Sequence, residues 1–272
     1  MPSLTPQKIE EIEPLLLALQ NELGVVVPDG KRSQLLQNLT PLLSSYGFSS
    51  TAELAERLQQ QDSAELKSNV LDVITRCYSD WSLSEELRRL LHKYILAQLN
   101  DNARIWVVGC GQGQLAYSVA MEIANHERIS SESKNIQIIA SDIPMADVES
   151  AEKGIYSNLE ISYLNEEYKR LYLSKLDSES WQIKEKVRQQ VSFKQCELTS
   201  DFQFIGHVDL IICPDILVYF SNEVKVAVLS QFSSLLKPGG VLLTGHNQLP
   251  APDTSGFERV EHSAGIFYRQ KA

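Results

Sequence analysis

The first part of the chain alternates apolar positions at helical spacing with polar turns. Thr5 before Pro6 is typical of an N-cap followed by proline at the first helical position, and the apolar periodicity then continues until Gly24. The same pattern begins again at Lys31 and ends before Gly47. Glycine commonly follows the last residue of a helix, so two helices are predicted, one before each glycine.

Two capping boxes predict further helices. In this pattern a serine caps the helix, and a glutamate three residues later reaches back to the backbone of the serine. The boxes are Ser50–Glu53 and Ser82–Glu85, and the helix after the second box runs to about Leu99. A helix over residues 66–75 lies between them. Residues 1–75 are therefore predicted to form a small all-helical domain.

The pattern changes at Ile105, where short apolar runs separated by helical segments replace the helical periodicity. This alternation is the signature of parallel βα units. The predicted strands are 105–109, 136–141, 208–213, 241–244 and a closing pair at 257–260 and 265–269, with helices over 114–126 and 222–236. Lys237-Pro-Gly-Gly240 is expected to end the second helix sharply. Residues 76–272 are predicted to be an α/β domain.

One segment of this domain does not fit the βα pattern. Residues 157–190 are polar and rich in lysine and glutamate, with too little apolar periodicity for a core unit. They are predicted to be a small insertion.

Composition narrows the function classes. The chain has 272 residues and a formal net charge of -10, with no long Lys/Arg run, so it offers no basic surface for a phosphate backbone and nucleic acid is not an expected partner. No stretch approaches the apolar length of a membrane span, and the start has no signal-peptide pattern, so a cytoplasmic protein is expected.

Cysteines and histidines do not suggest metal binding. The four cysteines lie far apart without CxxC spacing, and the five histidines form no HxxxH or HExxH pair. We interpret the cysteines as small buried hydrophobic residues and expect no metal site.

A glycine-rich turn follows the first predicted strand and precedes a helix. Gly109-Cys110-Gly111-Gln112-Gly113 lets the backbone approach a ligand without obstruction by Cβ, and the helix behind it directs amide groups toward an anionic group. By itself such a string is weak, because a tight packing turn needs the same glycines. Asp142, at the end of the next strand, adds a carboxylate that can accept hydrogen bonds from both ribose hydroxyls. Together these features predict a nucleoside site.

A dinucleotide dehydrogenase is the main chemical alternative for this site. Its fingerprint is GxGxxG, whereas this chain has GCGQG followed by Gln114, and no second mononucleotide-binding half follows residue 241. The ending, LLKPGG before an apolar strand and a terminal strand pair, suits a methyltransferase sheet better.

Several motifs occur in the order in which the chemotaxis receptor methyltransferases, the CheR family, carry them. They are LGVVVPDGKR (23–32), VVGCGQGQLAYSVA (107–120), IIASDI (138–143), KGIY (153–156), DLIICPDILVYF (209–220), LLKPGGVLLTGH (235–246) and the terminal FYRQK. The chain thus resembles the CheR family over nearly its whole length. The polar insertion falls where that family carries a small β subdomain.

This resemblance implies a fold and a reaction. The fold is a Rossmann-like class I methyltransferase sheet that binds S-adenosyl-L-methionine, with a small helical N-terminal domain. The reaction is methyl transfer to glutamate side chains of a protein substrate, a chemoreceptor or another protein with acceptor carboxylates. An ionised carboxylate needs in-line positioning and exclusion of water more than a strong base. Tyr219, from the YF of the family motif, is the candidate for positioning the acceptor; the alternative is that it only packs under the edge of the sheet.

The resemblance also implies a set of cofactor-binding residues. They are Gly109, Cys110, Gly111, Gly113, Asp142, Ile143, Glu197, Leu198 and Asp215. Two of these replace family residues. Glu197 stands where the family tends to have asparagine and is expected to accept from the adenine amino group. Asp215 stands in place of an asparagine and is expected to supply the negative charge that Gln114, at a usually acidic position, does not carry.

The substrate side departs further from the family pattern. The Thr-x-Phe-Phe-Arg motif corresponds to residues 77–82, which contain no arginine, although Arg76 lies next to them. The helix that carries several arginines in the family corresponds to residues 35–46, which contain no basic residue. Two interpretations stay open: an active protein-carboxyl methyltransferase, and a catalytically silent module that binds cofactor or partner proteins.

Overall fold

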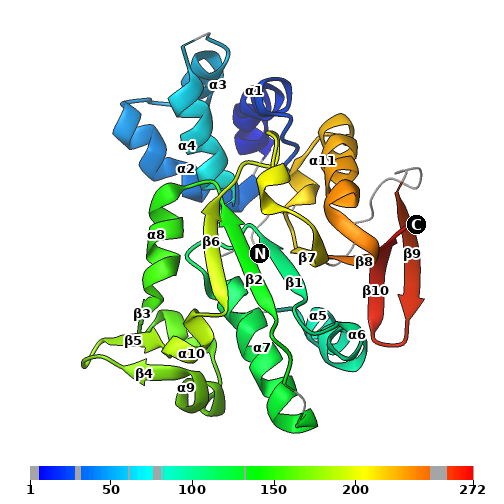
Figure 1. Ribbon diagram of the computed structural model, residues 1–272. Helices are drawn as coiled ribbons and strands as arrows, with labels where there is room; N and C mark the ends of the chain where they lie inside the picture. Colours follow the sequence, from blue (N-terminus) through cyan, green and yellow to red (C-terminus); the bar gives the residue numbers. More distant parts are fainter. Residues whose placement is uncertain are drawn as a thin grey trace. The chain divides into compact units, whose positions relative to one another are not determined.

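The computed structural model describes residues 6–27, 32–60, 62–75, 81, 83–131, 133–245 and 256–271 (Figure 1). Its contacts divide the chain into two units. The first comprises Met1–Tyr78 with Ile216–Ala227, and the second comprises Ser79–Asp215 with Val228–Ala272. The predicted helical domain ended at residue 75 and did not include the segment after Asp215; those domain boundaries stay a prediction.

Four helices form most of the first unit. They are α1 (Pro6–Leu23), α2 (Arg32–Tyr46), α3 (Thr51–Leu58) and α4 (Ala64–Thr75). Helix α1 packs on α3, and α2 packs on α4. Their apolar faces meet in one buried cluster that includes Leu15, Leu39 and Leu54. All four helices of the predicted helical domain are therefore confirmed.

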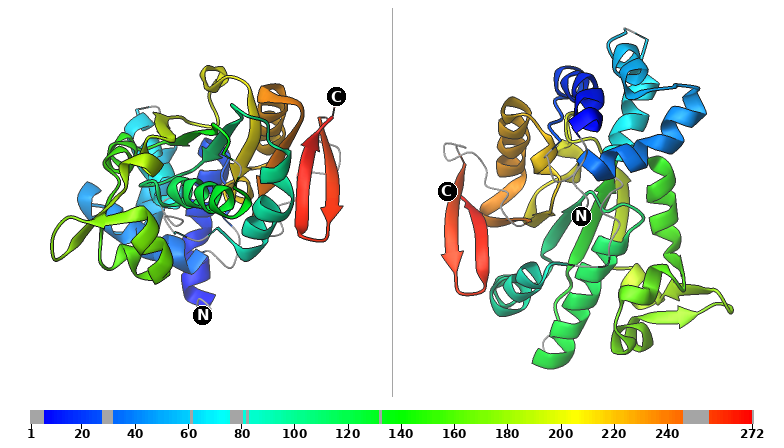
Figure 2. Two further views of the ribbon diagram at one scale, coloured as in Figure 1. Left: turned by 60° about the horizontal axis from the view of Figure 1, so that its bottom comes forward. Right: turned by 180° about the vertical axis from the view of Figure 1, so that it is seen from behind.

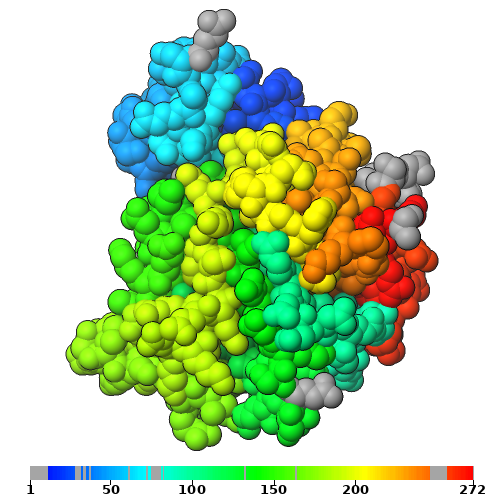
Figure 3. All heavy atoms as spheres, viewed as in Figure 1, coloured from blue at the N-terminus to red at the C-terminus, as the bar shows by residue number. Residues whose placement is uncertain are grey.

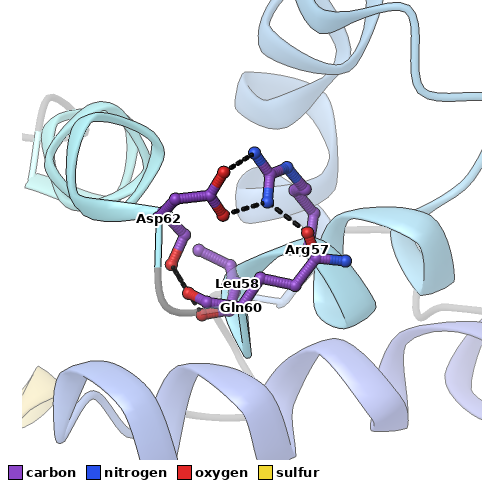
Figure 4. A network of polar contacts seen from close by, with 5 residues as sticks. Arg57, Leu58, Gln60 and Asp62 are labelled. Carbon is purple, nitrogen blue, oxygen red and sulfur yellow. Dashed lines mark hydrogen bonds and ion pairs between the residues drawn. The ribbon is translucent and has the colours of Figure 1, made fainter.

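Polar contacts at the ends of α3 fix the turns around it. The Ser50 hydroxyl accepts from the backbone N–H of Glu53, as the predicted capping box requires. The Glu53 carboxylate bonds Ser49 instead of Ser50, accepting from the backbone N–H at 2.7 Å. At the other end Arg57 donates to both carboxylate oxygens of Asp62, at 2.6 and 3.1 Å (Figure 4).

The second unit is built on a seven-stranded sheet with the order β6-β2-β1-β7-β8-β10-β9 (Figures 1 and 2). The strands are β1 (Arg104–Val108), β2 (Gln137–Asp142), β6 (Val191–Gln195), β7 (Val208–Cys213), β8 (Leu236–Thr244), β9 (Phe257–His262) and β10 (Gly265–Gln270). The first five strands in that order are parallel, while β10 pairs antiparallel with β8 and β9. The α/β fold predicted from the sequence is confirmed.

Alternation along the strands separates the two faces of the sheet. Ile105 and Val107 of β1 point into a large core that includes residues of α7 (Gln114–Ser130). Trp106, between them, contacts Phe202 and Phe232 on the other face, with ring centroids 5.1 and 5.3 Å apart. Both faces of β1 are buried, which explains why it reads as a continuous apolar run.

Two elements of the sheet region were not predicted. Strand β6 alternates buried and exposed residues and pairs only with β2, so as a short edge strand it has no continuous apolar run. Helix α8 (Met145–Lys153), which packs on β2 and β6, begins after Pro144 with no side-chain cap. Neither carries a strong local signal.

Two predicted element ends are wrong. Helix α11 (Asn222–Leu235) does not end in a turn at residues 237–240; that Lys-Pro-Gly-Gly segment lies within β8, where the pairing with β7 is irregular. Gly239 has a φ of 76°, in the left-handed region, and so allows the chain to deviate from regular strand geometry there. Ser82, the predicted cap of the next helix, lies outside the described residues, and the helix is capped by Ser84 instead. This helix divides into α5 (Glu85–Leu90), a π-helical segment (Leu91–Ile95) and α6 (Leu96–Gln98).

The predicted insertion forms a separate three-stranded sheet, β3-β5-β4, with strands at Ile155–Ser157, Leu173–Lys175 and Ser180–Ile183. Helices α9 (Glu166–Tyr172) and α10 (Glu185–Arg188) accompany it. Figure 3 shows this segment in yellow-green, standing out at one corner of the second unit. The small β insertion expected from the family resemblance is thus confirmed, while its predicted bounds, 157–190, stay a prediction.

Glu122 is a buried carboxylate on α7, with only 2% of the residue exposed. It accepts from Arg88 Nε at 2.9 Å, His92 Nε2 at 2.5 Å and the Tyr168 hydroxyl at 3.0 Å. Burial alone would raise the pKa of Glu122, but the hydrogen bond from His92 and the charge of Arg88 outweigh it and the pKa is lowered. This cluster joins α5, α7 and the insertion through one ionised group.

Candidate functional site

The glycine loop connects β1 to α7 and needs glycine at three positions. Gly109, Gly111 and Gly113 have φ values of 67°, 52° and 96°, in the left-handed region that other residues rarely adopt. The backbone N–H groups of Gly109 and Cys110 both donate to the Ser141 carbonyl, at 2.8 and 3.0 Å. The loop is thereby held against the end of β2.

Gly113 is the N-cap of α7 and provides no side chain to cap it. A Cβ atom there would lie 3.0 Å from the Tyr156 hydroxyl and 3.0 Å from Ala151, so packing as well as backbone conformation requires glycine. Within the described residues no side-chain cap accepts from the N-terminal amides of α7, so they can donate to an anionic ligand group.

Asp142 lies beside this loop and is 7% exposed. Its Oδ2 atom accepts from Gly111 N–H at 2.6 Å, and its Oδ1 atom accepts from Ile143 N–H at 2.8 Å. An ionised carboxylate has about four acceptor positions, so it can accept hydrogen bonds from several donors at once. The predicted ribose acid is therefore in contact with the predicted glycine loop.

Residues after β6 reach the same edge of the sheet. The backbone N–H of Cys196 donates to the Asp142 carbonyl at 2.9 Å, and Gln195 Nε2 donates to the Ile143 carbonyl at 2.8 Å. Leu198 is buried, while Glu197 is exposed and accepts from Thr199 Oγ1 at 2.6 Å. The carboxyl ends of β1, β2 and β6 thus adjoin, which is where open parallel sheets bind ligands.

Asp215 follows β7, the other neighbour of β1 in the sheet. It has a φ of 58°, unusual for a residue other than glycine, and is partly exposed. Burial raises the pKa of the Cys213 thiol, and the negative charge of Asp215 adds to this. Asp215 is therefore an acidic residue at the carboxyl end of the parallel strands, held in a conformation that needs support from its surroundings.

Two buried carboxylates make the glycine loop electronegative. Burial raises the pKa of the Cys110 thiol well above its usual value, and the charges of Asp142 and Asp147 raise it further. Asp147 is also tied to the loop, because Gln112 Nε2 donates to it at 3.2 Å. Such a field favours a cationic ligand group over a pyrophosphate.

Burial of the cysteines agrees with the sequence interpretation. Cys110, Cys196 and Cys213 are buried free thiols, and burial raises the pKa of Cys196 to about 11. Cys77 lies outside the described residues. Within the part of the chain that the structure describes, no group of three or more His, Cys, Asp or Glu residues could hold a metal ion.

Tyr219 belongs to the first unit. It lies in a 3-10 turn (Leu217–Tyr219), its carbonyl accepts from Val26 N–H, and its side chain, 5% exposed, packs in the core of the helical domain. This packing supports a structural role for the ring. A role in positioning the acceptor stays a prediction.

The segment in place of the family's arginine motif is described only at Trp81; Arg76 falls outside the described residues. The Trp81 ring packs edge-on against Tyr156 at 4.7 Å, and its carbonyl accepts from Ser118 Oγ at 2.7 Å. The Tyr156 hydroxyl in turn donates to the Gln112 carbonyl at 2.7 Å. The sequence did not predict these contacts, because nothing local indicates that Tyr156 bonds the glycine loop or that Trp81 packs on Tyr156.

Comparison with known proteins decides the family. A family model described as "CheR methyltransferase, SAM binding domain" matches residues 74–266, well over half of the chain. This chain belongs to the CheR methyltransferase family. The resemblance seen in the motifs is confirmed, and with it the reaction class, methyl transfer dependent on S-adenosylmethionine.

Curated relatives match the CheR chain over almost its whole length. Chemotaxis protein methyltransferase 1 of Pseudomonas aeruginosa is 30% identical over 261 residues, covering 93% of this chain and 95% of the relative. Chemotaxis protein methyltransferase Cher2 of Pseudomonas putida is 27% identical over 269 residues, covering 96% and 98%. Nothing in these comparisons favours the silent-module alternative.

No helix in the described ranges is long and apolar enough to cross a membrane.

Proposed function

We propose that this CheR-type chain transfers a methyl group from S-adenosylmethionine to glutamate side chains of a protein in the cytoplasm. A carboxylate oxygen attacks the methyl carbon, the carbon–sulfur bond breaks, and a glutamyl methyl ester and S-adenosylhomocysteine result. The positive charge of the sulfonium and the negative charge of the carboxylate cancel, so no proton has to be moved. The residues then have to position the two reactants and exclude water.

The observation that carries this proposal is the contact of Asp142 with the glycine loop. Both hydroxyls of the ribose can donate to this carboxylate. Gly109, Gly111 and Gly113 let the backbone approach the sulfur-bearing chain of the cofactor. We assign Cys110 to the same wall of the site.

The adenine base is assigned to the residues after β2 and β6. Ile143 and Leu198 offer apolar contact and backbone groups, and Glu197 is the proposed acceptor for the adenine amino group. The hydrogen bonds that hold Cys196 and Gln195 against residues 142 and 143 support this assignment, because they keep the two chain segments together.

The charge of the site supports a sulfonium cofactor over a dinucleotide. Asp142 and Asp147 are both buried at the loop, and a pyrophosphate there would meet two negative charges. A sulfonium and an ammonium would be stabilised by the same charges. Asp215 is the proposed counter-charge for the ammonium of the methionine part.

The acceptor is proposed to be a chemoreceptor-like protein, since the relatives are named chemotaxis protein methyltransferases. Helix α2 has Arg32 as its one basic residue, and Arg32 bonds Glu13 at 3.3 Å. We therefore expect weaker docking on acidic receptor helices than a basic helix would give. Tyr219 is retained as the proposed positioning residue for the acceptor.

Calorimetry with S-adenosylhomocysteine and with NAD tests the cofactor assignment. The proposal expects saturable binding of one S-adenosylhomocysteine per chain and no binding of NAD. Binding of NAD in its place would overturn the assignment, and binding of neither would remove both the active and the silent interpretation.

A further inference from the structure

A hollow of about 360 Å³ lies in the second unit, over strands β1, β2 and β6. Trp106 pairs with Ile139, and Ile139 pairs with Ser192, so these three residues share one face of the sheet. That face is opposite to the large core, on which α7 and α8 pack. Ile139 and Ser192 line the hollow, together with Arg104 and Gln137, the first residues of β1 and β2. The hollow is therefore on another part of the sheet than the cofactor residues, which follow the carboxyl ends of the strands.

Two cationic side chains line this hollow, Arg104 and Lys194. The guanidinium of Arg104 donates to the carbonyls of Ile205 and His207, both at 2.8 Å, which fix its position without neutralising its charge. Lys194 is exposed on β6, the edge strand of the sheet (Figure 1). Neither side chain forms an ion pair with a residue in the described ranges. Two such cations at one hollow favour an anionic group, and both kinds of side chain bind phosphate.

Two further lining residues indicate what else the ligand carries. The Oε1 atom of Gln190 is buried and has no hydrogen-bond partner among the described residues, so it can accept from an N–H or O–H group of a ligand. Phe204 is 59% exposed, which is high for a large apolar side chain, and it offers a flat ring. Nucleic-acid bases stack on such rings. Together the lining groups suit a ligand that combines an anion, an N–H donor and a flat ring.

We propose that this hollow binds a purine nucleoside monophosphate. Its phosphate lies at Arg104 and Lys194, its base stacks on Phe204, and an N–H group of the base donates to Gln190 Oε1. The volume suits one small ligand. A terminal phosphate carries about two negative charges at neutral pH, whereas each phosphate of a dinucleotide is a diester with a single charge, so NAD is not a ligand of this site. The inference does not depend on the proposed methyl transfer, since it concerns other residues.

Calorimetry on the whole protein saturated with S-adenosylhomocysteine tests the site. The titrated compounds are AMP, GMP, adenosine, ribose 5-phosphate, inorganic phosphate and NAD. We expect one AMP or GMP per chain, with adenosine and ribose 5-phosphate weaker by about tenfold or more, because each lacks one of the recognised parts. Binding of neither nucleotide would overturn the inference, and equal binding of the nucleotides, ribose 5-phosphate and inorganic phosphate would reduce the site to a surface that attracts anions.

The concentration of S-adenosylhomocysteine separates the two sites. Raising it should leave the affinity for the purine nucleotide unchanged, whereas competition would place the nucleotide in the cofactor site and overturn the inference. If S-adenosylhomocysteine does not bind at all, the proposed function fails, and the nucleotide titrations still decide this inference.

Variants assign each part of the ligand to its residue. Lys194→Met should weaken nucleotide binding by about tenfold, through loss of a charged hydrogen bond to the phosphate. Phe204→Ala should weaken it by about fivefold or more, through loss of stacking, and leave ribose 5-phosphate unchanged. Gln190→Met should weaken it by about fivefold and also leave ribose 5-phosphate unchanged.

The insertion offers matched controls for the exposed side chains. Lys175 is an exposed lysine of β4, and Leu159 is an apolar residue that is 77% exposed. Lys175→Met and Leu159→Ala should leave all affinities unchanged, and melting temperatures show whether each variant is folded. Folded Lys194→Met and Phe204→Ala variants that bind the nucleotide as tightly as the unaltered protein would overturn the assignment.

Discussion

Replacing Asp142 by alanine tests the centre of the cofactor site. The substitution removes two acceptors for the ribose hydroxyls, and hydrogen bonds to a charged group contribute about 1.5 to 3 kcal/mol each. Water can replace part of these hydrogen bonds once the carboxylate is removed. We therefore take the lower value for a single hydrogen bond as the minimum loss of binding free energy. Binding of S-adenosylhomocysteine should therefore weaken by at least about tenfold.

The same carboxylate also supports the fold, so affinity and stability have to be separated. Asp142→Ala leaves the backbone N–H groups of Gly111 and Ile143 without their acceptor, and the melting temperature should fall. Asp209 is a matched control, because its carboxylate also accepts two hydrogen bonds, from Arg104 N–H at 2.8 Å and Lys237 Nζ at 2.7 Å. Asp209 lies near the start of β7, at the amino end of the parallel strands, whereas Asp142 lies at their carboxyl end.

Calorimetry below the melting temperature of each variant supplies the comparison. Asp209→Ala should lower the melting temperature and leave the dissociation constant of S-adenosylhomocysteine unchanged, whereas Asp142→Ala should change both. An unchanged dissociation constant in Asp142→Ala would refute the ribose assignment, whatever its stability.

Three further predictions follow from the loop, the counter-charge and the buried glutamate. Gly111→Val should abolish measurable S-adenosylhomocysteine binding, because a β-branched residue is strained at a φ of 52° and fills the space of ligand approach; normal folding and binding would make the loop a simple turn. Asp215→Asn should weaken binding and Asp215→Asn with Gln114→Glu should restore much of it, and a zero coupling term in this four-member cycle would end the compensation hypothesis. Glu122 has a lowered pKa in the folded state, so its stabilisation is present above its usual value of 4.5 and is lost as the pH falls through the folded value. Glu122→Gln should therefore lower the melting temperature at neutral pH and reduce the loss on acidification; an identical pH profile would contradict this.

Sequence reasoning succeeded where a segment is buried on both sides or marked by a local cap. The apolar run of β7 and the helix that begins after Gly113 are examples, since burial and glycine conformation are written directly into their residues. Prediction from the sequence failed where contacts between residues distant in the chain determine the secondary structure. Edge strand β6 is half exposed, and the Lys-Pro-Gly-Gly segment continues into a strand because β7 lies beside it.

The site shows the same division. Adjacency of Asp142 and the glycine loop could be predicted, because parallel strands β1 and β2 end at one edge. Burial of the Gln114 side-chain oxygen, which has no hydrogen-bond partner within the described ranges, could not be predicted, because the sequence shows only a polar residue at the start of a helix. Trp81 lies 75 positions before Tyr156 in the sequence, and only the folded chain brings the two rings together.

Transfer of a labelled methyl group tests the central claim most directly. The chain is incubated with S-adenosylmethionine carrying a labelled methyl group and with proteins of the organism that encodes it, with the Asp142→Ala variant as control. We predict label on protein that mild alkali releases as methanol, as a carboxyl methyl ester requires, and far less label with the variant. Label that resists alkali would contradict carboxyl methylation, and binding of S-adenosylhomocysteine with no label on any protein would favour the silent module.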